Sequence, residues 1–304
     1  MGRQFLGVDI GGTAVKLGIV TEQGETCATA ERSVNFDGYR TPILDTVLAA
    51  AREFVAAQGV TPDGVGISAT GQIDSRAGVV AGTCGSLPGW IGAPLRQSFA
   101  DWLGVPVAVA NDANCMCLGE AWVGAARGYT DVIGVTIGTG LGGGILTGGR
   151  LLEGARGLGG ELGHFPTHAR GGETCTCGQT GCWERYASTS ALVRTARAAH
   201  TGYPDGRALF EAAARGESMA CGLLDSWIRE IAAGLIGLTH VFNPQLLLIG
   251  GGVSAQTKLL IEPLACRVRA GLMPAFVEGL EIRAAALQNA AGLVGAVKYL
   301  LDTL

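Results

Sequence analysis

The sequence predicts an α/β protein made of two lobes with similar plans. A strand–glycine loop–strand pattern, "LGVDIGGTAVKLGIV" at residues 6–20, recurs as "IGVTIGTGLGGGIL" at residues 133–146. Apolar runs of strand length alternate with helical patterns along the chain, which is typical of α/β sheets. The length of 304 residues suits about two domains. Because the strand–glycine loop–strand pattern occurs again near the middle of the chain, we expect two duplicated lobes that share a cleft.

The elements of the first lobe follow in order. Residues 1–37 are expected to form three strands, and residues 42–58 form a helix behind a Thr-Pro start. Residues 65–69 read as a short strand. Residues 105–112 read as a buried strand that ends in a polar pair, and residues 113–126 continue as a helix. This order of strands and helices precedes the second glycine hairpin.

The second lobe begins with a hairpin over residues 132–150 and carries an insertion at 151–186. Helices follow to about residue 242, where an Asn-Pro break precedes a buried strand at 246–249. The last helix, near residues 290–301, is amphipathic. We therefore expect residues 1–121 and 290–304 in the smaller lobe and residues 122–289 in the larger one.

Composition excludes several classes of protein. The net charge is −4 and the pI is near 5.6, so no basic surface for nucleic acid is expected, and a phosphate site must use local backbone N–H groups and a metal. The apolar stretch 231–253 is interrupted by polar residues and is no membrane span. No secretion leader is visible before the first strand. Nine cysteines without such a leader argue against a disulfide framework, so we expect a reducing cytoplasm.

The two glycine loops suit phosphate binding. A strand–turn–strand device is often only a hairpin. The repetition favours a second interpretation, in which glycines allow close approach of a ligand and backbone N–H groups meet phosphate oxygens. Two such loops could hold one polyphosphate from both sides. The residues concerned are Gly11, Gly12 and Thr13 in the first loop, and Gly138, Thr139 and Gly140 in the second.

Only the first of the two glycine hairpins contains an acidic residue at the end of its first strand. Asp9 stands where the second copy has Thr136. Mg²⁺ bound to a triphosphate takes one or two protein carboxylates besides phosphate oxygens. A second carboxylate in the other loop would mostly repel the nucleotide. The sequence therefore predicts that Asp9 holds Mg²⁺ beside a triphosphate.

A third glycine run, Gly250, Gly251 and Gly252, follows the buried strand "LLLIG". Ligands of α/β lobes lie at the carboxyl ends of strands, so this run is a candidate nucleotide contact. The patterns GxGxxG before a βαβ unit and GxxxxGK[ST] are not clearly present. Their absence argues against a dehydrogenase and against a P-loop NTPase.

One histidine and three cysteines predict a structural zinc site. His164, Cys175, Cys177 and Cys182 lie within "GHFPTHARGGETCTCGQTGCWE". Four nitrogen and sulfur ligands complete a tetrahedral Zn²⁺ shell and leave no open position. The alternative, three unpaired buried cysteines, fits poorly with a segment rich in Gly and Thr. We expect zinc to hold the glycine-rich insertion in shape.

Two glutamates flank this cluster. Glu161 lies three residues before His164, and Glu184 lies two residues after Cys182. Carboxylates on a rigid loop accept charge-assisted hydrogen bonds from sugar hydroxyls. Each glutamate could equally be a solvated surface acid. A zinc frame favours the sugar-binding interpretation.

The pair Asn111-Asp112 ends a buried strand and begins a helix. Asp112 could merely cap that helix. It could instead be a general base that takes a proton from a hydroxyl during phosphoryl transfer. The residues alone leave both interpretations open.

These motifs together resemble the ROK sugar-kinase family of the actin-like ATPase superfamily. "DIGGT", "ND" after an apolar strand, "GTGLGGG", "GGELGH", "CTCGQTGCWE" and "NPQLLLIGGG" stand in that family's order, over nearly the whole chain. The resemblance implies two actin-like (ribonuclease H-like) lobes around a hinged cleft, with a zinc-stabilised insertion in the second lobe. It implies ATP between the lobes and a hexose deeper in the cleft.

The resemblance also implies roles for particular residues. Asp112 matches the family's catalytic base, and Gly250–Gly252 lies on its adenosine side. The glycine loops match its phosphate motifs, and the His/Cys cluster its zinc ligands. Its sugar contacts match Asn111, Asp112, Glu161, His164 and Glu184, with Gly71 and Ser86 at positions that border the sugar pocket.

Two departures concern the substrate. Thr70-Gly71 stands where many glucokinases of the family have Pro-Gly, and Ser86-Leu87 stands where they have Asn-Leu. We expect an ATP- and Mg²⁺-dependent hexose 6-kinase, with glucose as first substrate and N-acetylmannosamine or another N-acetylhexosamine as the alternative. A non-catalytic sugar sensor and a zinc-ribbon nucleic-acid module are the competing classes. A homodimer is expected, with neither nucleic acid nor membrane as a partner.

Overall fold

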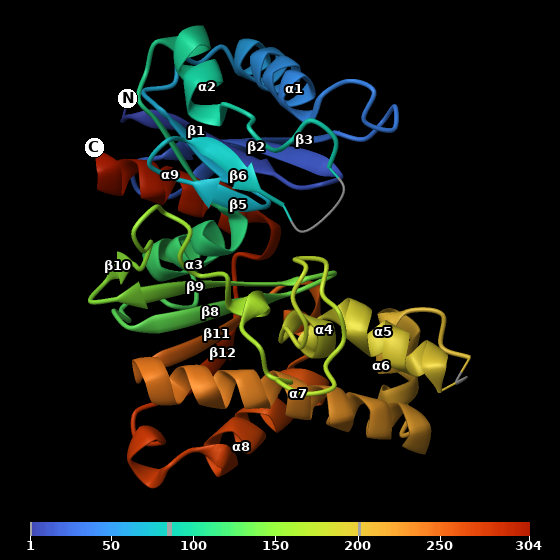
Figure 1. Ribbon diagram of the computed structural model, residues 1–304. Coiled ribbons are helices and arrows are strands. Elements are labelled where there is room, and N and C mark those ends of the chain that lie inside the picture. Colours follow the sequence, from blue (N-terminus) through green and yellow to red (C-terminus); the bar gives the residue numbers. More distant parts are fainter. Residues whose placement is uncertain (1, 84–86, 200–201) are drawn as a thin grey trace. The chain divides into compact units, whose positions relative to one another are not determined.

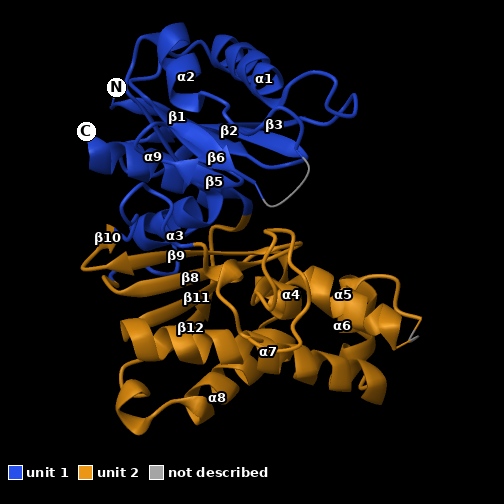
Figure 2. Cartoon of the chain, viewed as in Figure 1, with its two compact units in different colours: residues 1–128, 151–160, 289–304 blue, residues 129–150, 161–288 orange. Residues whose placement is uncertain are grey.

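A computed structural model describes residues 2–83, 87–199 and 202–304. The chain forms two compact units (Figure 2). The first comprises Met1–Gly128, Leu151–Gly160 and Asn289–Leu304, and the second comprises Tyr129–Arg150 and Glu161–Gln288. Residues 151–160 thus belong with the first unit, while the rest of the segment 151–186 belongs with the second.

The first unit is built on a five-stranded sheet with the order β3-β2-β1-β4-β7. Strands β1, β2 and β3 form an antiparallel meander, whereas β1, β4 and β7 run parallel. Parallel neighbours need crossover connections, which the intervening helices supply. The strands are β1 (Gln4–Ile10), β2 (Ala14–Thr21), β3 (Thr26–Ser33), β4 (Val65–Ala69) and β7 (Val107–Asn111), with a separate hairpin of β5 (Gln72–Asp74) and β6 (Val79–Gly82).

The two faces of this sheet differ because side chains alternate along each strand. Leu6, Val8 and Ile10 of β1 pack into the core beneath α1 and α2, while Gly7 faces the opposite side. On that side α9 and α3 lie against the sheet (Figure 1). The helices are α1 (Ile43–Gln58), α2 (Leu95–Leu103), α3 (Asp112–Val123) and α9 (Ala291–Thr303).

Glycines allow α9 to lie unusually close to its neighbours. A Cβ on Gly66 of β4 would overlap the carbonyl oxygen of Ala296, and one on Gly295 would overlap the carbonyl oxygen of Cys115 on α3. A Cβ on Gly7 would lie 3.0 Å from the carbonyl oxygen of Leu293. These contacts involve backbone atoms, which cannot move aside as a flexible side chain can. The C-terminal helix is therefore part of the N-terminal core.

The second sheet repeats the plan of the first, with the order β10-β9-β8-β11-β12. β8 pairs antiparallel with β9, and β8, β11 and β12 run parallel, as β1, β4 and β7 do. Both hairpins turn through three residues, 11–13 and 138–140. The strands are β8 (Val132–Ile137), β9 (Leu141–Thr147), β10 (Arg150–Leu151), β11 (Leu246–Gly250) and β12 (Glu281–Ala284).

Helices of the second unit bury its apolar core. The long helix α7 packs against α4, α6 and α8, and its Trp227, Ile231 and Leu235 join the buried residues of β8 and β11. It ends at Asn243, whose left-handed backbone (φ 45°) precedes Pro244, as the Asn-Pro break predicted. The helices are α4 (Glu184–Ala187), α5 (Thr189–Ala198), α6 (Gly206–Ala214), α7 (Ser218–Phe242) and α8 (Glu262–Gly271).

The predicted α/β class and the repeated hairpin are confirmed. The strand expected at 65–69 and the helix expected at 42–58 form within one residue of those bounds. Within the described ranges, none of the helices is both long and apolar enough to cross a bilayer.

Candidate active site

Polar side chains of the first unit gather where its three parallel strands end. Asp9 of β1 is in register with Ser68 of β4, and Ala69 of β4 is in register with Asn111, the last residue of β7. The carboxyl ends of parallel strands meet at one edge of a sheet, which is where α/β proteins bind ligands. The structure therefore brings Asp9, Asn111 and Asp112 to one edge.

Asp9 is a largely buried carboxylate with two polar neighbours. The Ser68 hydroxyl donates a hydrogen bond to its Oδ1 at 2.6 Å, and the Lys16 ammonium lies 3.9 Å from its Oδ2. Burial raises the pKa of Asp9, while Ser68 and Lys16 oppose that rise. A desolvated carboxylate beside a glycine loop gains from a cation, so its surroundings fit the predicted Mg²⁺ ligand.

Asn111, and not Asp112, caps α3. The Asn111 Oδ1 accepts hydrogen bonds from the backbone N–H groups of Ala113 (2.9 Å) and Asn114 (3.3 Å). Asp112 is the first residue of the helix. Its Oδ1 also accepts a hydrogen bond from the Ala113 N–H at 2.9 Å, but the N-cap position itself belongs to Asn111.

A buried thiol lies close to both acids. Burial, and then the negative charges of Asp9 and Asp112, raise the pKa of the Cys115 thiol on α3 well above its usual range. The thiol is fully buried. Asp9 and Asp112 therefore approach the same point of the first unit, as a Mg²⁺ ligand and a base of one reaction would have to.

The loop at Thr70-Gly71 is fixed by hydrogen bonds to two side chains. The Thr70 carbonyl accepts a hydrogen bond from the indole N–H of the buried Trp90 at 2.9 Å, and the Gly71 carbonyl accepts one from Asn111 Nδ2 at 2.9 Å. Gly71 has φ +101°, and a Cβ there would lie 2.7 Å from the Gly82 carbonyl oxygen. Ser86, the other predicted pocket residue, lies outside the described residues.

The first glycine loop is closed by backbone and side-chain contacts. The Gly11 N–H donates to the Ala14 carbonyl at 2.9 Å, and the Tyr39 hydroxyl donates to the Gly12 carbonyl at 2.7 Å. Thr13 is exposed. The loop thus has a fixed backbone and a hydroxyl that is open to a ligand.

The second glycine loop is tied to the helices that follow it. The Gly138 N–H donates to the Gly140 carbonyl at 2.9 Å, and the Gly138 carbonyl accepts from the Thr189 N–H (2.9 Å) and hydroxyl (2.5 Å). Thr139 and Gly140 are exposed. The loop is therefore anchored to the start of α5.

The third glycine run borders a hollow of about 630 Å³ between α5 and α6. Gly250 ends β11, and Gly251 (φ +87°) packs so tightly on β8 that a Cβ would overlap the Ile137 carbonyl oxygen. Gly252 lines the hollow together with apolar and polar side chains from the helices. This mixture suits a planar base and its sugar. The residues of α5 and α6 in the lining are Thr189, Leu192, Val193, Gly206, Arg207, Phe210, Glu211 and Ala214.

The four predicted zinc ligands come together. One ligand atom from each of His164, Cys175, Cys177 and Cys182 lies within 4.8 Å of the others. Cys175 Sγ is 3.7 Å from His164 Nδ1, and Cys177 Sγ is 3.6 Å from Cys182 Sγ. A tetrahedral Zn²⁺ with Zn–S bonds near 2.3 Å has ligand–ligand edges of about 3.8 Å. The donor set and its spacing therefore fit zinc.

Local turns explain why the cysteines converge. The Cys175 N–H donates to the Gln179 carbonyl (2.7 Å), and the Gly178 N–H donates back to the Cys175 carbonyl (3.0 Å). Burial, and then the neighbouring thiols of Cys177 and Cys175, raise the pKa of the Cys182 thiol to about 12. A dication would favour thiolates in such a cluster.

The two ring nitrogens of His164 have different neighbours. Its Nδ1 points to the cysteine cluster, while its Nε2 lies 3.9 Å from Glu161 Oε2. Burial raises the pKa of Glu161, the imidazole opposes the rise, and Glu184 adds to it. The ring can thus serve a metal with one nitrogen and the predicted sugar site with the other.

Glu184, the first residue of α4, contacts the second glycine loop. Its Oε2 accepts a hydrogen bond from the Leu141 N–H at 2.9 Å. A Cβ on Gly140 would lie 2.6 Å from the same oxygen. A predicted sugar ligand and a predicted phosphate loop are therefore in direct contact within the second unit.

Two residues of this site were missed in the sequence analysis. Lys16 stands directly opposite Asp9 in the first hairpin, and the register of a three-residue turn could have revealed it. The corresponding partner of Thr136 in the second hairpin is Gly142, so only the first copy carries a charge pair. Ser68 is buried in an apolar strand, where its hydroxyl was the available signal.

Comparisons with known proteins agree with this geometry. The pattern of the ROK family matches residues 5–303. A glucokinase of Thermotoga maritima is 34% identical over 313 residues, which cover 98% of each chain. A ROK family glucokinase of Streptomyces griseus, solved with glucose and AMPPNP, is 34% identical with a TM-score of 0.80 over 96% of this chain and 97% of that one.

A third relative has another substrate assignment. A proposed N-acetylmannosamine kinase from Listeria monocytogenes is 30% identical, with a TM-score of 0.80 over 99% of each chain. The sequence pattern, the whole-length similarity and the shared fold lead to one conclusion. This chain belongs to the ROK family.

Proposed function

We propose that the protein transfers the γ-phosphoryl group of ATP to the 6-hydroxyl of a hexose, with glucose as its first substrate. That it is a sugar kinase follows from its family and from its similarity to glucokinases over the whole chain. The hexose, the hydroxyl and the roles of individual residues are the proposal.

The proposed base is Asp112, and its position beside Asp9 at the edge of the first sheet is the observation that carries it. The Asp112 Oδ1 accepts a hydrogen bond from the Ala113 N–H at 2.9 Å, but the N-cap of a helix is the residue that precedes its first turn. Here Asn111 takes that role, and Asp112 stands at the strand edge near Asp9. A carboxylate in this position can accept the proton of a sugar hydroxyl.

The reaction then balances without another reactant. The sugar oxygen forms a bond to the γ-phosphorus, the bond from that phosphorus to the bridging oxygen breaks, and ADP leaves. Asp112 takes the hydroxyl proton. Each glycine loop contributes backbone N–H groups to the phosphates, and Mg²⁺, held by Asp9, would neutralise charge on them.

Glu161, His164 and Glu184 are the proposed sugar ligands of the second unit. Their support is the cysteine cluster, which fixes His164, and the bond from Leu141 that fixes Glu184. Zn²⁺ bound at the cluster would hold this frame in shape. Asn111 still has one amide hydrogen without a described acceptor, which a sugar oxygen can take.

The adenosine moiety is proposed to lie in the hollow beside Gly252. Phe210 and Leu192 offer an apolar wall there, and Gln256 and Glu211 offer polar groups. A nucleobase stacks on apolar side chains, and a few hydrogen bonds determine which nucleobase is bound. This interpretation makes α5 and α6 the nucleotide-facing helices.

A panel of sugars tests the proposal. We would measure kcat/KM for glucose, mannose, fructose, N-acetylglucosamine and N-acetylmannosamine at the same ATP and Mg²⁺ concentrations. Glucose is expected to lead, because a buried polar site rejects a sugar that leaves its groups unpaired. A tenfold advantage for N-acetylmannosamine, about 1.4 kcal/mol of transition-state preference, would overturn glucose as first substrate. No turnover with any sugar would support the sensor class instead.

N-acetylmannosamine is the second candidate because of the 30% identical Listeria protein and the change from Pro to Thr at position 70. An N-acetyl group needs space and an apolar wall near the sugar. Hydrogen bonds from Trp90 and Asn111 hold the Thr70 and Gly71 carbonyls in place. Because this loop is held, it does not open the space that an N-acetyl group needs, and glucose is favoured. The expected homodimer remains a proposal that a measurement of mass in solution would test.

A further inference from the structure

The first glycine loop is braced by the segment that follows β3, here called the Tyr39 loop (residues 35–41). The Tyr39 hydroxyl donates a hydrogen bond to the Gly12 carbonyl at 2.7 Å, and the side-chain amide of Asn35 donates one to the same hydroxyl at 3.5 Å. The Tyr39 ring is partly buried and packs against the core of the first unit. A phenol that is held by its ring therefore fixes one carbonyl of a proposed phosphate loop.

The backbone of Tyr39 is held in a strained conformation. Its φ is +61°, in the left-handed region that a bulky side chain rarely adopts. Asp37 Oδ2 accepts hydrogen bonds from the N–H (3.0 Å) and the hydroxyl (2.8 Å) of Thr41, and these bonds close the loop around Tyr39. Strained residues persist where their surroundings hold them, and they gather at functional sites. The Tyr39 loop is therefore a candidate for a functional role.

The bond to the Gly12 carbonyl sets the direction of the next N–H group. A peptide unit is planar and trans, so the Gly12 carbonyl and the Thr13 N–H point in opposite directions. The Thr13 N–H therefore points away from the Tyr39 hydroxyl, and it makes no hydrogen bond with the described residues. The Thr13 carbonyl accepts a bond from the Val34 N–H at 2.9 Å, so the following peptide unit is held as well. The loop thus presents one unoccupied donor in a fixed direction.

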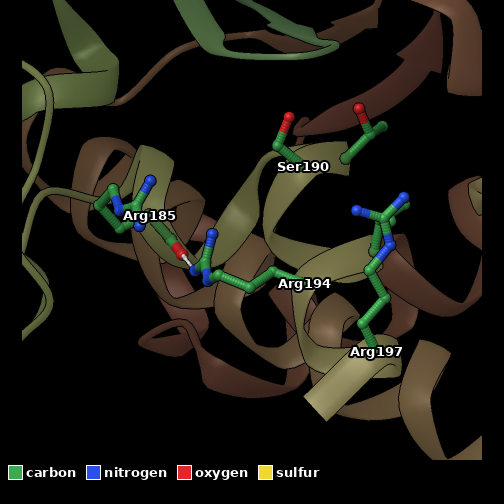
Figure 3. A pocket seen from close by; sticks show the side chains of 6 residues that line it. Arg185, Ser190, Arg194 and Arg197 are labelled. Carbon is green, nitrogen blue, oxygen red and sulfur yellow. Dashed lines mark hydrogen bonds between the residues drawn. The ribbon is translucent and has the colours of Figure 1, made fainter. Parts of the chain in front are cut away.

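The second glycine loop has positive charge in its neighbourhood. Thr189, whose N–H and hydroxyl hold the Gly138 carbonyl, also lines a hollow of the second unit. The cations that share this lining are Arg185, Arg194 and Arg197 (Figure 3). An anion at the second loop can therefore gain from guanidinium groups as well as from backbone N–H groups.

At the first glycine loop the nearby charge is balanced. The Lys16 ammonium lies 3.9 Å from Asp9 Oδ2, so the carboxylate offsets much of the attraction that this cation has for an anion. Phosphate binding at this loop depends more on the direction of its N–H groups. The contact that sets this direction at Thr13 is the hydrogen bond from Tyr39.

We propose that Tyr39 is a positioning residue for the phosphate chain of the nucleotide. Through the Gly12 carbonyl it directs the Thr13 N–H toward a phosphate oxygen, and it does not itself bind the ligand. A donor that already points at the developing charge needs no reorganisation during transfer, so both phosphate affinity and turnover gain. This inference rests on the proposed function, because it takes the first glycine loop as a phosphate site.

Tyr39→Phe tests the role, because it removes the hydroxyl and keeps the ring that packs on the core. We would measure the binding of adenosine, and of AMPPNP with Mg²⁺, by calorimetry. Affinity for AMPPNP should fall about tenfold, because a hydrogen bond to a charged group is weakened. Affinity for adenosine, which has no phosphate, should not change.

Tyr129→Phe is the matched control. The Tyr129 hydroxyl donates a hydrogen bond to Glu281 at 2.6 Å, and Tyr129 precedes β8, whereas the second glycine loop follows that strand. The control should bind both ligands as the wild type does. Thermal unfolding of both Phe variants checks that they are folded.

A second variant and a kinetic measurement separate positioning from simple stability. Asp37→Ala opens the Tyr39 loop but keeps the hydroxyl, so it should weaken AMPPNP binding in the same direction and by a smaller factor. In Tyr39→Phe, kcat/KM for ATP should fall together with AMPPNP affinity, while KM for the sugar stays within about twofold. A brace that only stabilises the fold would instead lower the unfolding temperature and weaken adenosine and AMPPNP alike.

Two results would overturn the role of Tyr39. One is AMPPNP affinity that is unchanged in Tyr39→Phe, and the other is an equal loss of affinity for adenosine and AMPPNP. Either result in a protein that phosphorylates a sugar refutes only this inference. Selective loss of AMPPNP affinity in a protein without sugar turnover supports Tyr39 and refutes only the proposed transfer to sugar. Wild-type protein that binds no AMPPNP overturns both.

Discussion

The carboxylate of Glu184 accepts a hydrogen bond from the backbone N–H of Leu141, at 2.9 Å, and so joins α4 to the second glycine loop. Gly140, the residue before Leu141, has no room for a Cβ beside that carboxylate. A side chain proposed to bind sugar thus also shapes a loop proposed to bind phosphate. The kinetics of the two substrates should respond together to changes at this position.

Glu184→Ala should raise KM for both the sugar and ATP, since it removes a sugar acceptor and frees the loop. Glu184→Gln keeps an oxygen acceptor for Leu141, so we expect it to affect the sugar KM more than the ATP KM. Steady-state kinetics with each substrate varied would show this difference. Glu278→Ala, an exposed glutamate elsewhere in the second unit, is the control. An ATP KM unchanged in Glu184→Ala would contradict the coupling.

Asp112→Asn tests whether Asp112 is the general base of phosphoryl transfer. The substitution keeps the shape of the side chain but removes its ability to take a proton, so kcat should fall by at least about 10²-fold. Sugar affinity, measured by equilibrium binding, should change much less. Turnover near that of the wild type would remove Asp112 from the proposed role.

Ser68→Ala tests whether the hydroxyl of Ser68 keeps Asp9 deprotonated. The Ser68 hydroxyl stabilises the charged form of Asp9 and opposes the rise that burial causes in its pKa. Without it the pKa rises further, so more of Asp9 is protonated at a given pH and less is able to hold Mg²⁺. We therefore expect the acid limb of the pH profile of kcat/KM to move to higher pH, with the plateau changed less. Ser226→Ala, on the exposed face of α7, should leave the limb in place.

Zinc content tests the cysteine cluster. Metal analysis should find about one zinc per chain, and Cys177→Ser should lose it. Sugar binding should weaken more than nucleotide binding, because His164 and the proposed sugar glutamates lie on or next to the cluster. Cys266→Ser, an exposed cysteine of α8, is the matched control. A metal-free protein with full activity would show that the cluster has another purpose.

Gly295→Ala tests the packing of α9. A Cβ at this position would overlap the backbone of α3, so we expect a loss of about 3 kcal/mol in the free energy of unfolding. Gly237→Ala, at an exposed helix position with open space, should instead add about 0.5–1 kcal/mol. Denaturant titrations of the two variants make a matched pair. Equal stabilities would mean that α9 and α3 can separate at little cost.

The sequence predicted those features whose residues lie close together along the chain. The zinc ligands span nineteen residues with tight turns between them, so their spacing alone indicated a site. The two glycine hairpins could be predicted because the same sequence pattern occurs twice. The α/β class and the two similar lobes followed from the order of apolar strands and helices.

Features made by distant residues were missed. Residues 151–160 join the first unit because Glu153 accepts hydrogen bonds from Ser75 (2.8 Å) and Tyr299 (2.5 Å), which lie far away in the chain. Neither partner carries a local signal. The short strands β5 and β6 were missed for a related reason, since Gln72–Asp74 has too few residues to show a period. The roles of individual site residues stay predictions until the experiments above are done.

The position of α9 has a consequence for the order of events during synthesis. Residues 291–303 pack against β1, β4 and α3, so the core that includes β1 cannot close until this helix has left the ribosome. Residues 161–288 include no part of that helix and can fold while the chain is still growing. The nascent protein should therefore expose the strands of its first unit to chaperones until residues 291–303 have emerged. A stalled or prematurely terminated chain would leave that half without its closing segment.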